Sequence, residues 1–279
     1  MVLITALFSP AAQARAHLKI STTLTAFEGF NNWTAGRSFE NIKSFQNSNA
    51  SRPVVDLVLQ LQALKAGGLD FDFELVPSLT YELAKKELIQ GRVDLTAETL
   101  WDDEIAENAA RLLKSDPVIR NGEFVKGIYV LSTNDKLLKL TSIDEVHGAI
   151  ATVVASWALD VKTVESMQVK AVVQTVTPEQ AFKAILKNQA DFILYEFSAQ
   201  ADLHVESGGV RLVPVPGYKV GIIGSRSWAI SKSSPVAGAV FGALVAGTKI
   251  LRESGTIERA YTESGFFNVK VAAWKKYSE

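Results

Sequence analysis

The pattern of apolar and polar positions predicts the same supersecondary unit twice, in well-separated parts of the chain. Each copy is a strand, a helix and a second strand, over residues 71–77, 80–91 and 93–100 in the first copy and 170–176, 178–188 and 190–197 in the second. The closing strands read VDLTAETL and ADFILYEF, short and mostly apolar runs that are typical of buried parallel strands. The repeat therefore predicts two similar halves, each built on a parallel sheet.

Acidic residues stand at the start and near the end of both closing strands. Asp94 and Asp191 begin the strands, and Glu98 and Glu196 follow where each strand runs out into its loop. Open α/β sheets bind ligands in the crevice beyond the carboxyl ends of their strands. We therefore expect Glu98 and Glu196 to lie on facing walls of one cleft between the two halves.

The rest of the chain continues this alternation of strands and helices. Further strands are predicted near residues 17–23, 125–132, 149–155, 210–214 and 220–230, and further helices over 53–65, 235–251 and on through 261. An aromatic loop is expected after the first strand. Ser142-x-x-Glu145 and the segment 177–180 are capping boxes that mark helix starts. Such alternation predicts an α/β fold with two Rossmann-like lobes.

No Pro-, Gly- or Ser-rich linker separates the two halves. The order of elements is better explained if the chain crosses between the lobes twice, near residues 124–125 and again near 221–227. The first lobe then comprises residues 17–124 plus 223–279, and the second comprises residues 125–222. Two adjacent crossings form a two-segment hinge, which permits closure over a ligand.

Composition excludes several classes of function. The net charge is −1, so the chain has no electrostatic footprint for nucleic acid. Cysteine is absent, which excludes disulfides, thiolate metal sites and a cysteine nucleophile. His17, His147 and His204 are scattered and lack the spacing of a metal site on one helix. We expect no metal and no cofactor.

The N-terminal segment 1–14 reads MVLITALFSPAAQA and has the features of a secretory signal peptide. An apolar stretch too short to span a bilayer leads to the small-x-small pattern that ends at Ala14. No Lys or Arg precedes Arg15, and a buried first strand or a disordered leader is the alternative. We expect export, cleavage near Ala14 and a periplasmic protein.

Several phrases, in order from Leu18 to the end, resemble one known family. They are LKISTT, LIQGRVDLTAET, LLKSDPVI, GIYVLSTN, LTSIDEVHGAIATVVASW, ILKNQADFILYEFSA and VGIIGSRSWAISKSSP. Together they resemble the extracellular solute-binding proteins of family 3, the amino-acid-type receptors of ABC importers. The resemblance implies a type 2 periplasmic binding protein fold, a small-molecule ligand between the lobes, and a monomer that meets an ABC permease in the inner membrane.

The resemblance also implies roles for individual residues. Glu196 stands where the family holds the ligand's amino group, although a solvated strand-end glutamate is the alternative. Ser156 and Trp157 follow a second-lobe strand where the family binds an anionic ligand group, although Ser156 fits an N-cap equally well. Phe27 and Trp33 stand where an aromatic ring stacks on the ligand, or where one fills the core.

The chain departs from the family at the residue that clamps the ligand's carboxylate. The family places an arginine about a dozen residues after the first-lobe Asp, whereas this chain has Ala106, with Arg111 further on. An arginine clamp on an ordinary amino acid is therefore in doubt, and acids with several aromatics favour a cationic or aromatic solute. The candidate ligand-binding residues are Thr23, Phe27, Trp33, Glu98, Thr99, Trp101, Ser156, Trp157, Tyr195 and Glu196.

Two other functions use the same cleft. The protein could supply a ligand to a membrane sensor instead of a permease, and the sequence does not separate these roles. Some proteins of this fold are periplasmic dehydratases, in which Glu98 or Glu196 would act as a general acid or base. The chain has no Ser/His/Asp arrangement, P-loop or dinucleotide-binding glycine motif, so we expect a binding protein and not an enzyme.

Overall fold

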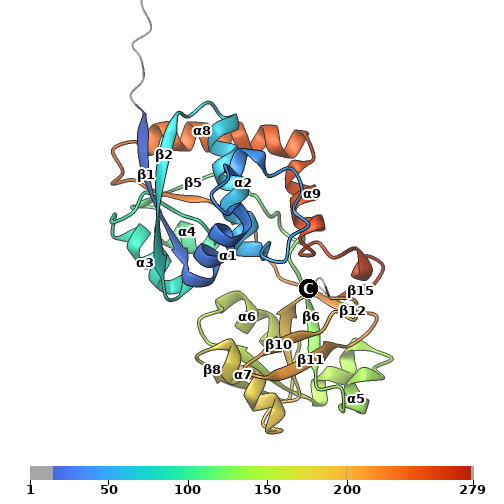
Figure 1. Ribbon diagram of the computed structural model, residues 1–279. Helices are drawn as coiled ribbons and strands as arrows, with labels where there is room; N and C mark the ends of the chain where they lie inside the picture. Colours follow the sequence, from blue (N-terminus) through green and yellow to red (C-terminus); the bar gives the residue numbers. More distant parts are fainter. Residues whose placement is uncertain (1–14, 199, 278–279) are drawn as a thin grey trace, which may run out of the picture.

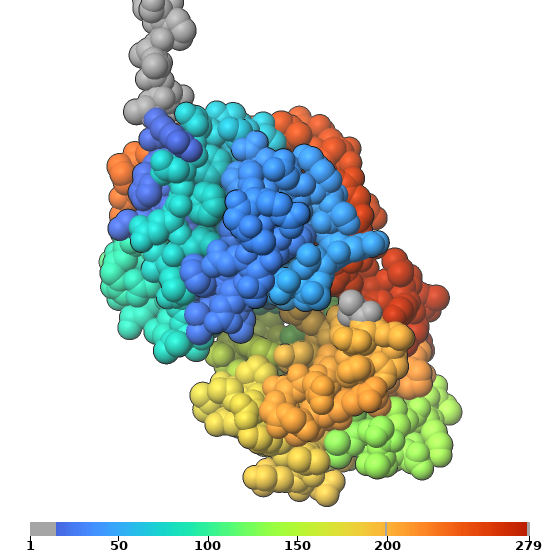
Figure 2. All heavy atoms as spheres, viewed as in Figure 1, coloured from blue at the N-terminus to red at the C-terminus, as the bar shows by residue number. Residues whose placement is uncertain are grey.

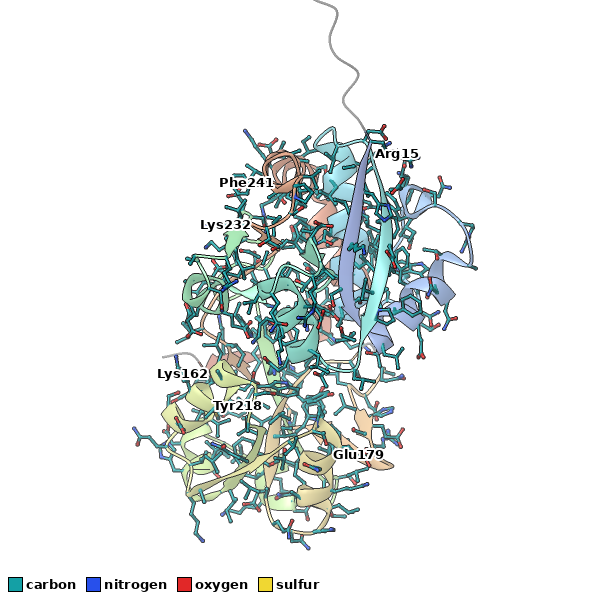
Figure 3. The ribbon with its side chains drawn as sticks, turned by 90° about the vertical axis from the view of Figure 1, so that its left-hand side faces the viewer. Arg15, Lys162, Glu179, Tyr218, Lys232 and Phe241 are labelled. Carbon is teal, nitrogen blue, oxygen red and sulfur yellow. The ribbon has the colours of Figure 1, made fainter. Side chains whose placement is uncertain are left out.

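The computed structural model describes residues 15–198 and 200–277. The expected signal peptide, residues 1–14, lies outside the described residues. The chain forms two lobes that are joined by extended segments (Figure 1). The turned view in Figure 3 separates the first lobe, which carries Arg15, Lys232 and Phe241, from the second, which carries Lys162, Glu179 and Tyr218. The predicted α/β fold with two lobes is confirmed.

The first lobe contains a five-stranded sheet in the order β2-β1-β3-β14-β5. Its strands are β1 (Ala16–Thr23), β2 (Phe71–Ser78), β3 (Leu95–Thr96), β5 (Leu112–Lys114) and β14 (Ala229–Ser231). β1 runs parallel to both β2 and β3, and β14 runs antiparallel to β3 and β5. The surrounding helices are α1 (Leu24–Thr34), η1 (Phe39–Asn41), α2 (Arg52–Ala66), α3 (Tyr81–Ile89), α4 (Asp102–Glu107), α8 (Ala237–Glu253) and α9 (Thr256–Glu263).

Two glycines let α2 and α8 approach closely. A Cβ atom at Gly67 would lie 2.0 Å from the carbonyl oxygen of Ala243, and one at Gly247 would lie 1.8 Å from that of Ala63. Only glycine fits between backbones at such distances. This close packing covers the apolar side of α2, on which Leu57, Leu61 and their neighbours are fully buried. The close approach involves the C-terminal end of α2, whereas the N-terminal end, which begins at Arg52, faces the other lobe.

The second lobe contains a sheet in the order β10-β11-β6-β9-β7-β8, with β12 and β15 paired beside β6. Its strands are β6 (Val125–Val130), β7 (Ile150–Val154), β8 (Ala171–Thr175), β9 (Phe192–Glu196), β10 (Val205–Ser207), β11 (Val210–Pro214), β12 (Tyr218–Gly221) and β15 (Lys275–Tyr277). Its helices are α5 (Asp135–Leu138), η2 (Ile143–Gly148), α6 (Ala158–Ser166), α7 (Pro178–Leu186) and η3 (Val269–Val271). The predicted capping box of Ser142 and Glu145 forms at η2. At α7 the box is incomplete: Thr177 accepts from the Gln180 N–H, but the Gln180 side chain accepts from the N–H of Val176, one residue before the N-cap.

The chain crosses between the lobes on adjacent extended segments. β6 and β12 pair antiparallel, with Val125 opposite Gly221, and the Ile222 N–H donates to the Phe124 carbonyl at 2.9 Å. β13 (Arg226–Ser227) then pairs with β4 (Leu100–Trp101) in the first lobe. The two crossings therefore lie side by side, as expected.

Three local expectations are wrong. The aromatic segment after β1 is helix α1, because Ala26, Phe30 and Trp33 recur at helical spacing and bury one face. The single strand expected over 220–230 is divided into β12, β13 and β14, because the chain changes lobes at Gly224, whose φ is 141°. The strand expected over 93–100 is divided into β3 and β4.

The C-terminal end also differs from the expected division into lobes. β15 pairs in parallel with β12, and Val271 is buried in the second lobe's core cluster with Trp274 against it. Residues 223–279 were expected in the first lobe, but the pairing places 275–277 on the second sheet. Among the described residues, no helix combines the length and apolar character needed to cross a bilayer.

Candidate ligand-binding site between the lobes

Polar and aromatic side chains from both lobes meet beside the crossings. Figure 2 shows a crevice between the lobes on the face that carries α1 and α2. The first lobe contributes the N-terminal end of α2 and the ends of β1, β3 and β4. The second lobe contributes the end of β9, the start of β6 and the first turn of α6. These elements bring together charged groups that lie far apart in the sequence.

An arginine of the first lobe reaches the predicted acid of the second lobe. Arg52 opens α2, and its Nε lies 3.2 Å from Oε1 of Glu196 at the end of β9. One turn later on α2, Oδ2 of Asp56 lies 3.0 Å from Nη1 of Arg52. Burial disfavours the charged guanidinium, but Glu196 and Asp56 outweigh it and hold the pKa of Arg52 above its usual value. Glu196 therefore already has a cationic partner from within the protein.

Asp56 is fully buried and holds three elements together. Its Oδ2 accepts from the Thr99 N–H at 3.0 Å and from the Thr99 hydroxyl at 2.9 Å, and its Oδ1 accepts from the Tyr261 hydroxyl at 2.6 Å. Burial, together with the negative charge of Asp56, raises the pKa of Tyr261 well above its usual value. A buried carboxylate with this many donors is satisfied without a ligand.

A second arginine enters from the crossing segment. Arg226 of β13 is only 4% exposed, and its Nε donates to the Thr99 hydroxyl at 3.0 Å while Nη2 donates to the Thr99 carbonyl. Its guanidinium carbon lies 4.5 Å from the centre of the Trp101 ring and 5.8 Å from that of Tyr81. Among residues 15–198 and 200–277, no carboxylate lies within ion-pair distance of Arg226. Trp101 orients this cation by cation–π contact.

The second lobe carries its own buried ion pair at the crossing. Lys126 of β6 pairs with Asp160 of α6, and both are 4% exposed. The ammonium also lies 4.5 Å from the centre of the Trp157 ring. Burial raises the pKa of Asp160, and Lys126 offsets part of that rise. The charges of Lys126 and Asp160 thus neutralise each other within the second lobe.

The predicted acid of the first lobe is buried without a cation bonded to it. Glu98 is 2% exposed, and its Oε1 accepts from the Thr23 N–H at 3.0 Å and the Thr23 hydroxyl at 2.6 Å. Its Oε2 has no hydrogen-bond partner among the described residues. Burial raises the pKa of Glu98, and the bonds from Thr23 and the charge of Arg52 offset part of that rise. Glu98 and Glu196 thus both lie near Arg52.

Tyr195 is a further aromatic residue of the second lobe and lies beside Trp157. Its ring centre lies 6.1 Å from that of Trp157 and 5.2 Å from that of Phe182. Burial and the neighbouring Glu196 raise the pKa of Tyr195 to about 12. The phenol therefore stays neutral and can donate a hydrogen bond.

Trp33 lies away from this group, and within the described residues neither Phe27 nor Ser156 makes a hydrogen bond or an aromatic contact with it. Trp33 is buried in the first lobe's core, with its ring centre 5.7 Å from that of Phe45. Phe27 is half-buried on α1. Ser156 is exposed, and Trp157, not Ser156, occupies the N-cap position of α6. Arg111 is exposed beyond α4 and supplies no clamp.

Sequence reasoning missed five charged residues at the lobe boundary. They are Arg52, Asp56, Lys126, Asp160 and Arg226. The Arg-Pro pair at the start of α2 was a usable signal, because it places a cation at a helix start where a cation is otherwise unfavourable. The part of the chain that the structure describes contains no group of three or more His, Asp or Glu side chains that could hold a metal ion.

No protein-family model matches this chain, and no curated protein matches it in sequence. Solved structures do match it. The probable amino-acid ABC transporter extracellular-binding protein ytmK of Bacillus subtilis has a TM-score of 0.59 at 11% identity, over 90% of this chain and 97% of that one. The periplasmic VFT2 domain of Bordetella pertussis BvgS has a TM-score of 0.58 at 17% identity, over 90% and 93% of the two chains.

A third solved structure is an ancestral amino-acid-binding protein, described as a precursor of cyclohexadienyl dehydratase. Its TM-score is 0.53 at 17% identity, over 89% of this chain and 94% of that one. The fold is that of the type 2 periplasmic binding proteins. In this protein, the charged residues described above lie where the two lobes of this fold face each other.

Proposed function

We propose that this protein captures a small amino-acid-like solute between its two lobes in the periplasm and delivers it to an ABC importer. The observation that carries this proposal is Arg226. A buried guanidinium that rests on an aromatic ring and has no carboxylate partner among the described residues favours a ligand with an anionic group. Arginine binds carboxylates through two parallel N–H···O bonds. Arg226 would thus replace the arginine that is absent at position 106.

The charges around Arg226 support a carboxylate-bearing ligand over a purely cationic one. Three of the acids on the boundary have cationic partners within the protein: Asp56 and Glu196 pair with Arg52, and Asp160 pairs with Lys126. A cationic group could reach these three acids only by displacing a partner, so Glu98 is the one acid of this group that is available to it. An anionic group on the ligand instead supplies the charge that Arg226 lacks.

Glu98 offers the complementary group for an ammonium. Its Oε2 is buried without a hydrogen-bond partner among the described residues, and Thr99, the next residue, contacts Arg226. A ligand ammonium at Glu98 would satisfy Oε2 and favour the carboxylate form, in spite of burial. Arg226 and Glu98 together supply one cation and one carboxyl group, the two groups that a zwitterionic amino acid requires.

The paired crossings support a capture mechanism in which the lobes separate to admit the solute and close over it. The Arg52–Glu196 contact joins the lobes directly, so it contributes to the closed arrangement with or without solute. A solute that contacts both lobes shifts the equilibrium toward the closed state by its differential affinity. The closed protein then presents surfaces of both lobes to the permease.

A thermal-shift and calorimetric screen tests this function. The protein is mixed with zwitterionic amino acids, dicarboxylates, polyamines and quaternary amines. A true ligand at a hundredfold excess over its Kd stabilises the fold by about 2.7 kcal/mol. We expect a zwitterionic amino acid to bind, and Arg226→Gln to weaken binding by about a hundredfold.

Controls separate binding from folding. Arg111→Gln removes an exposed arginine of the same lobe and should leave affinity unchanged, and Glu98→Gln should weaken amino-acid binding without affecting a simple carboxylate. Circular dichroism checks that each variant folds. Binding of polyamines alone, or full affinity in folded Arg226→Gln, would remove Arg226 from the site and contradict the carboxylate assignment.

A further inference from the structure

A third segment of the chain passes between the lobes, in addition to the two crossings of the hinge. Residues 264–277 form a strap that leads from α9 of the first lobe to β15, which pairs with β12 of the second lobe. Figure 1 shows this strap beside β12, on the same side of the molecule as the crossings. The described chain therefore passes from lobe to lobe three times.

The first anchor of the strap lies in the first lobe, beside Arg52. The Phe267 N–H donates to the Tyr261 carbonyl at 2.9 Å, and the ring centre of Phe266 lies 5.3 Å from that of Tyr261. The guanidinium carbon of Arg52 lies 6.0 Å from the centre of the Phe266 ring. Tyr261 and Arg52 also share a partner, because both bind Asp56. The strap thus starts against the residues that hold Arg52 in place.

The second anchor lies in the second lobe, directly after Glu196. The side-chain amide of Asn268 donates to the Ser198 carbonyl at 2.8 Å. The ring centre of Trp274 lies 5.5 Å from that of Phe197, in an edge-to-face arrangement. Phe197 and Ser198 are the two residues that follow Glu196. The strap therefore contacts the segment that positions the strand-end acid of the second lobe.

Lysine side chains add to the second anchor. Lys219 of β12 donates to the Val271 and Ala272 carbonyls of the strap at 2.7 and 2.8 Å. Lys270 of the strap donates to the Gln200 carbonyl of the second lobe at 2.8 Å. Bonds thus run in both directions between the strap and the second lobe.

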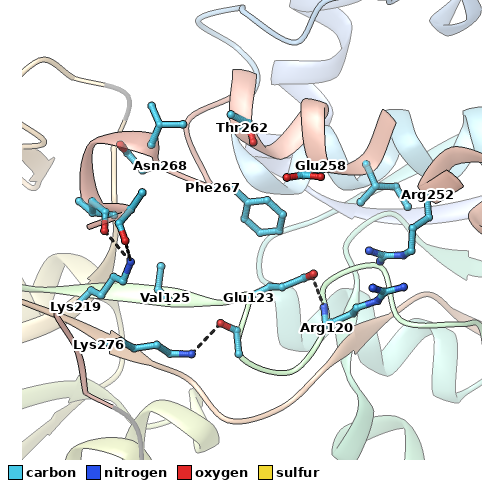
Figure 4. Close-up of a pocket in the computed structure, with 15 residues that line it drawn as sticks. Arg120, Glu123, Val125, Lys219, Arg252, Glu258, Thr262, Phe267, Asn268 and Lys276 are labelled. Atoms are coloured by element: carbon cyan, nitrogen blue, oxygen red, sulfur yellow. Dashed lines mark hydrogen bonds between the residues drawn. The ribbon is translucent and has the colours of Figure 1, made fainter. Parts of the chain in front are cut away.

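A cavity separates the middle of the strap from the two crossings of the hinge. Its volume is about 550 Å³, and its lining includes residues 267–269 and 271–272 of the strap and residues 122, 123 and 125 of the first crossing. Figure 4 shows Asn268 on one side of this cavity and Val125 on the other. The middle of the strap therefore does not pack against the crossings, and it joins the lobes separately from them.

Neighbouring residues of the strap are bonded to opposite lobes. Phe267 is bonded to Tyr261 of the first lobe and Asn268 to Ser198 of the second. Because consecutive Cα atoms are only about 3.8 Å apart, the strap has no slack between its two anchors. Ser198 and Tyr261 can therefore move apart only if one of these bonds breaks.

We propose that the strap is a third connection that restricts the separation of the lobes and keeps Glu196 opposite Arg52. Glu196 stands two residues before Ser198, and Arg52 shares Asp56 with Tyr261. The two anchors thus hold both partners of the ion pair that joins the lobes. This role concerns the lobes themselves and does not depend on the proposed solute.

Distance measurements between two spin labels, made without solute, test the proposal. The chain contains no cysteine, so Leu79→Cys and Val176→Cys place one label in each lobe. Both positions are exposed. They follow β2 and β8, and Figure 1 shows β8 and the neighbouring α3 on the side of the molecule away from β12 and β15. The distance distribution therefore reports how far and how freely the lobes move apart.

The test variant carries an insertion of Gly-Ser-Gly between Phe267 and Asn268. The insertion leaves both anchors in place and adds about 10 Å of extended chain between them. We expect a broader distance distribution with a longer mean distance than in the labelled protein without the insertion. A second variant, Asn268→Ala with Trp274→Ala, weakens the second anchor and should show the same change. An unchanged distribution in the folded insertion variant would overturn the proposal.

A matched control weakens the second lobe away from the strap. Asn134→Ala with Leu138→Ala also removes one amide and one apolar side chain, and these residues belong to α5 and its N-cap. Urea unfolding compares the stability lost by the control with that lost by the strap variants. We expect the control to keep the distance distribution of the labelled protein. An equal broadening in the control would show that general destabilisation moves the lobes apart, and the strap would then have no special role.

Discussion

The two copies of the strand–helix–strand unit agree at one acidic position and differ at the other. Asp94 accepts from the Lys19 N–H at 2.8 Å, and Asp191 accepts from the Ile150 N–H at 2.7 Å. In both lobes, the aspartate at the start of the closing strand therefore binds the backbone of the neighbouring parallel strand. These residues serve the sheet and not the ligand.

The acids at the far ends of the two units have different surroundings. Glu98 is 2% exposed and bonded to Thr23 of its own lobe, whereas the side chain of Glu196 is 33% exposed and pairs with Arg52 across the boundary. Their distances from the opening aspartate differ by one residue, and successive side chains in a strand point to opposite faces. The repeated topology thus gives Asp94 and Asp191 the same structural role. The roles of Glu98 and Glu196 differ, because each has different neighbours.

The largest expected effect is on stability and concerns the buried Lys126–Asp160 ion pair, which lies within the second lobe. Asp160→Ala leaves Lys126 buried without a partner, because both residues are 4% exposed. Loss of one member of a buried pair costs about 3–5 kcal/mol. Urea unfolding followed by circular dichroism measures this loss. As a control, Asp202→Ala breaks an exposed pair with Arg211 and should cost less than about 1 kcal/mol.

The shared structural role of the two aspartates predicts equal costs. Asp94→Ala and Asp191→Ala each leave one backbone N–H of the neighbouring strand without its charged acceptor. Hydrogen bonds to charged groups contribute about 1.5–3 kcal/mol each. Unfolding free energies of the two variants should therefore agree with each other. A loss confined to one lobe would show that the two units are not equivalent.

The burial of Glu98 predicts that this residue makes the stability of the protein depend on pH. Because burial raises the pKa of Glu98 above its ordinary value of 4.5, the folded protein binds more protons than the unfolded chain above that pH. Its contribution to stability therefore falls as pH rises from 4.5 through the raised pKa. Glu98→Gln should show a shallower decline than the unmodified protein in unfolding measurements across this range. An identical decline would place Glu98 in contact with water.

The smallest expected effect is on the contact between the lobes. Glu196 is partly exposed, so the free energy of its pair with Arg52 is screened and should be below about 1 kcal/mol. A double-mutant cycle with Arg52→Gln and Glu196→Gln measures this coupling in urea unfolding. Small-angle X-ray scattering on Glu196→Gln should show a more open average arrangement. A coupling of several kcal/mol would mean that the pair is sealed from solvent.

Local patterns were sufficient to predict most of the elements. The strands near 17–23, 71–77 and 210–214 and the helices after Thr80 and Pro178 form within a residue or two of their expected bounds, since apolar periodicity and caps act over a few residues. The errors occur where contacts with residues distant in the sequence determine the secondary structure or the lobe to which a segment belongs. Residues 24–34 form a helix against the sheet, and residues 275–277 pair with β12 of the other lobe.

The candidate site likewise has features that the sequence predicts and features that only the folded protein shows. The repeat, the two lobes and the acids Glu98 and Glu196 at the strand ends follow from the sequence alone, because topology places strand ends at the cleft. The folded protein adds that Glu196 pairs with Arg52 and that Arg226 rests on Trp101 without a carboxylate partner among the described residues. These partners are more than a hundred residues apart in the chain. Periodicity carries no signal over that separation, and so charge pairing across the boundary appears only in the folded protein.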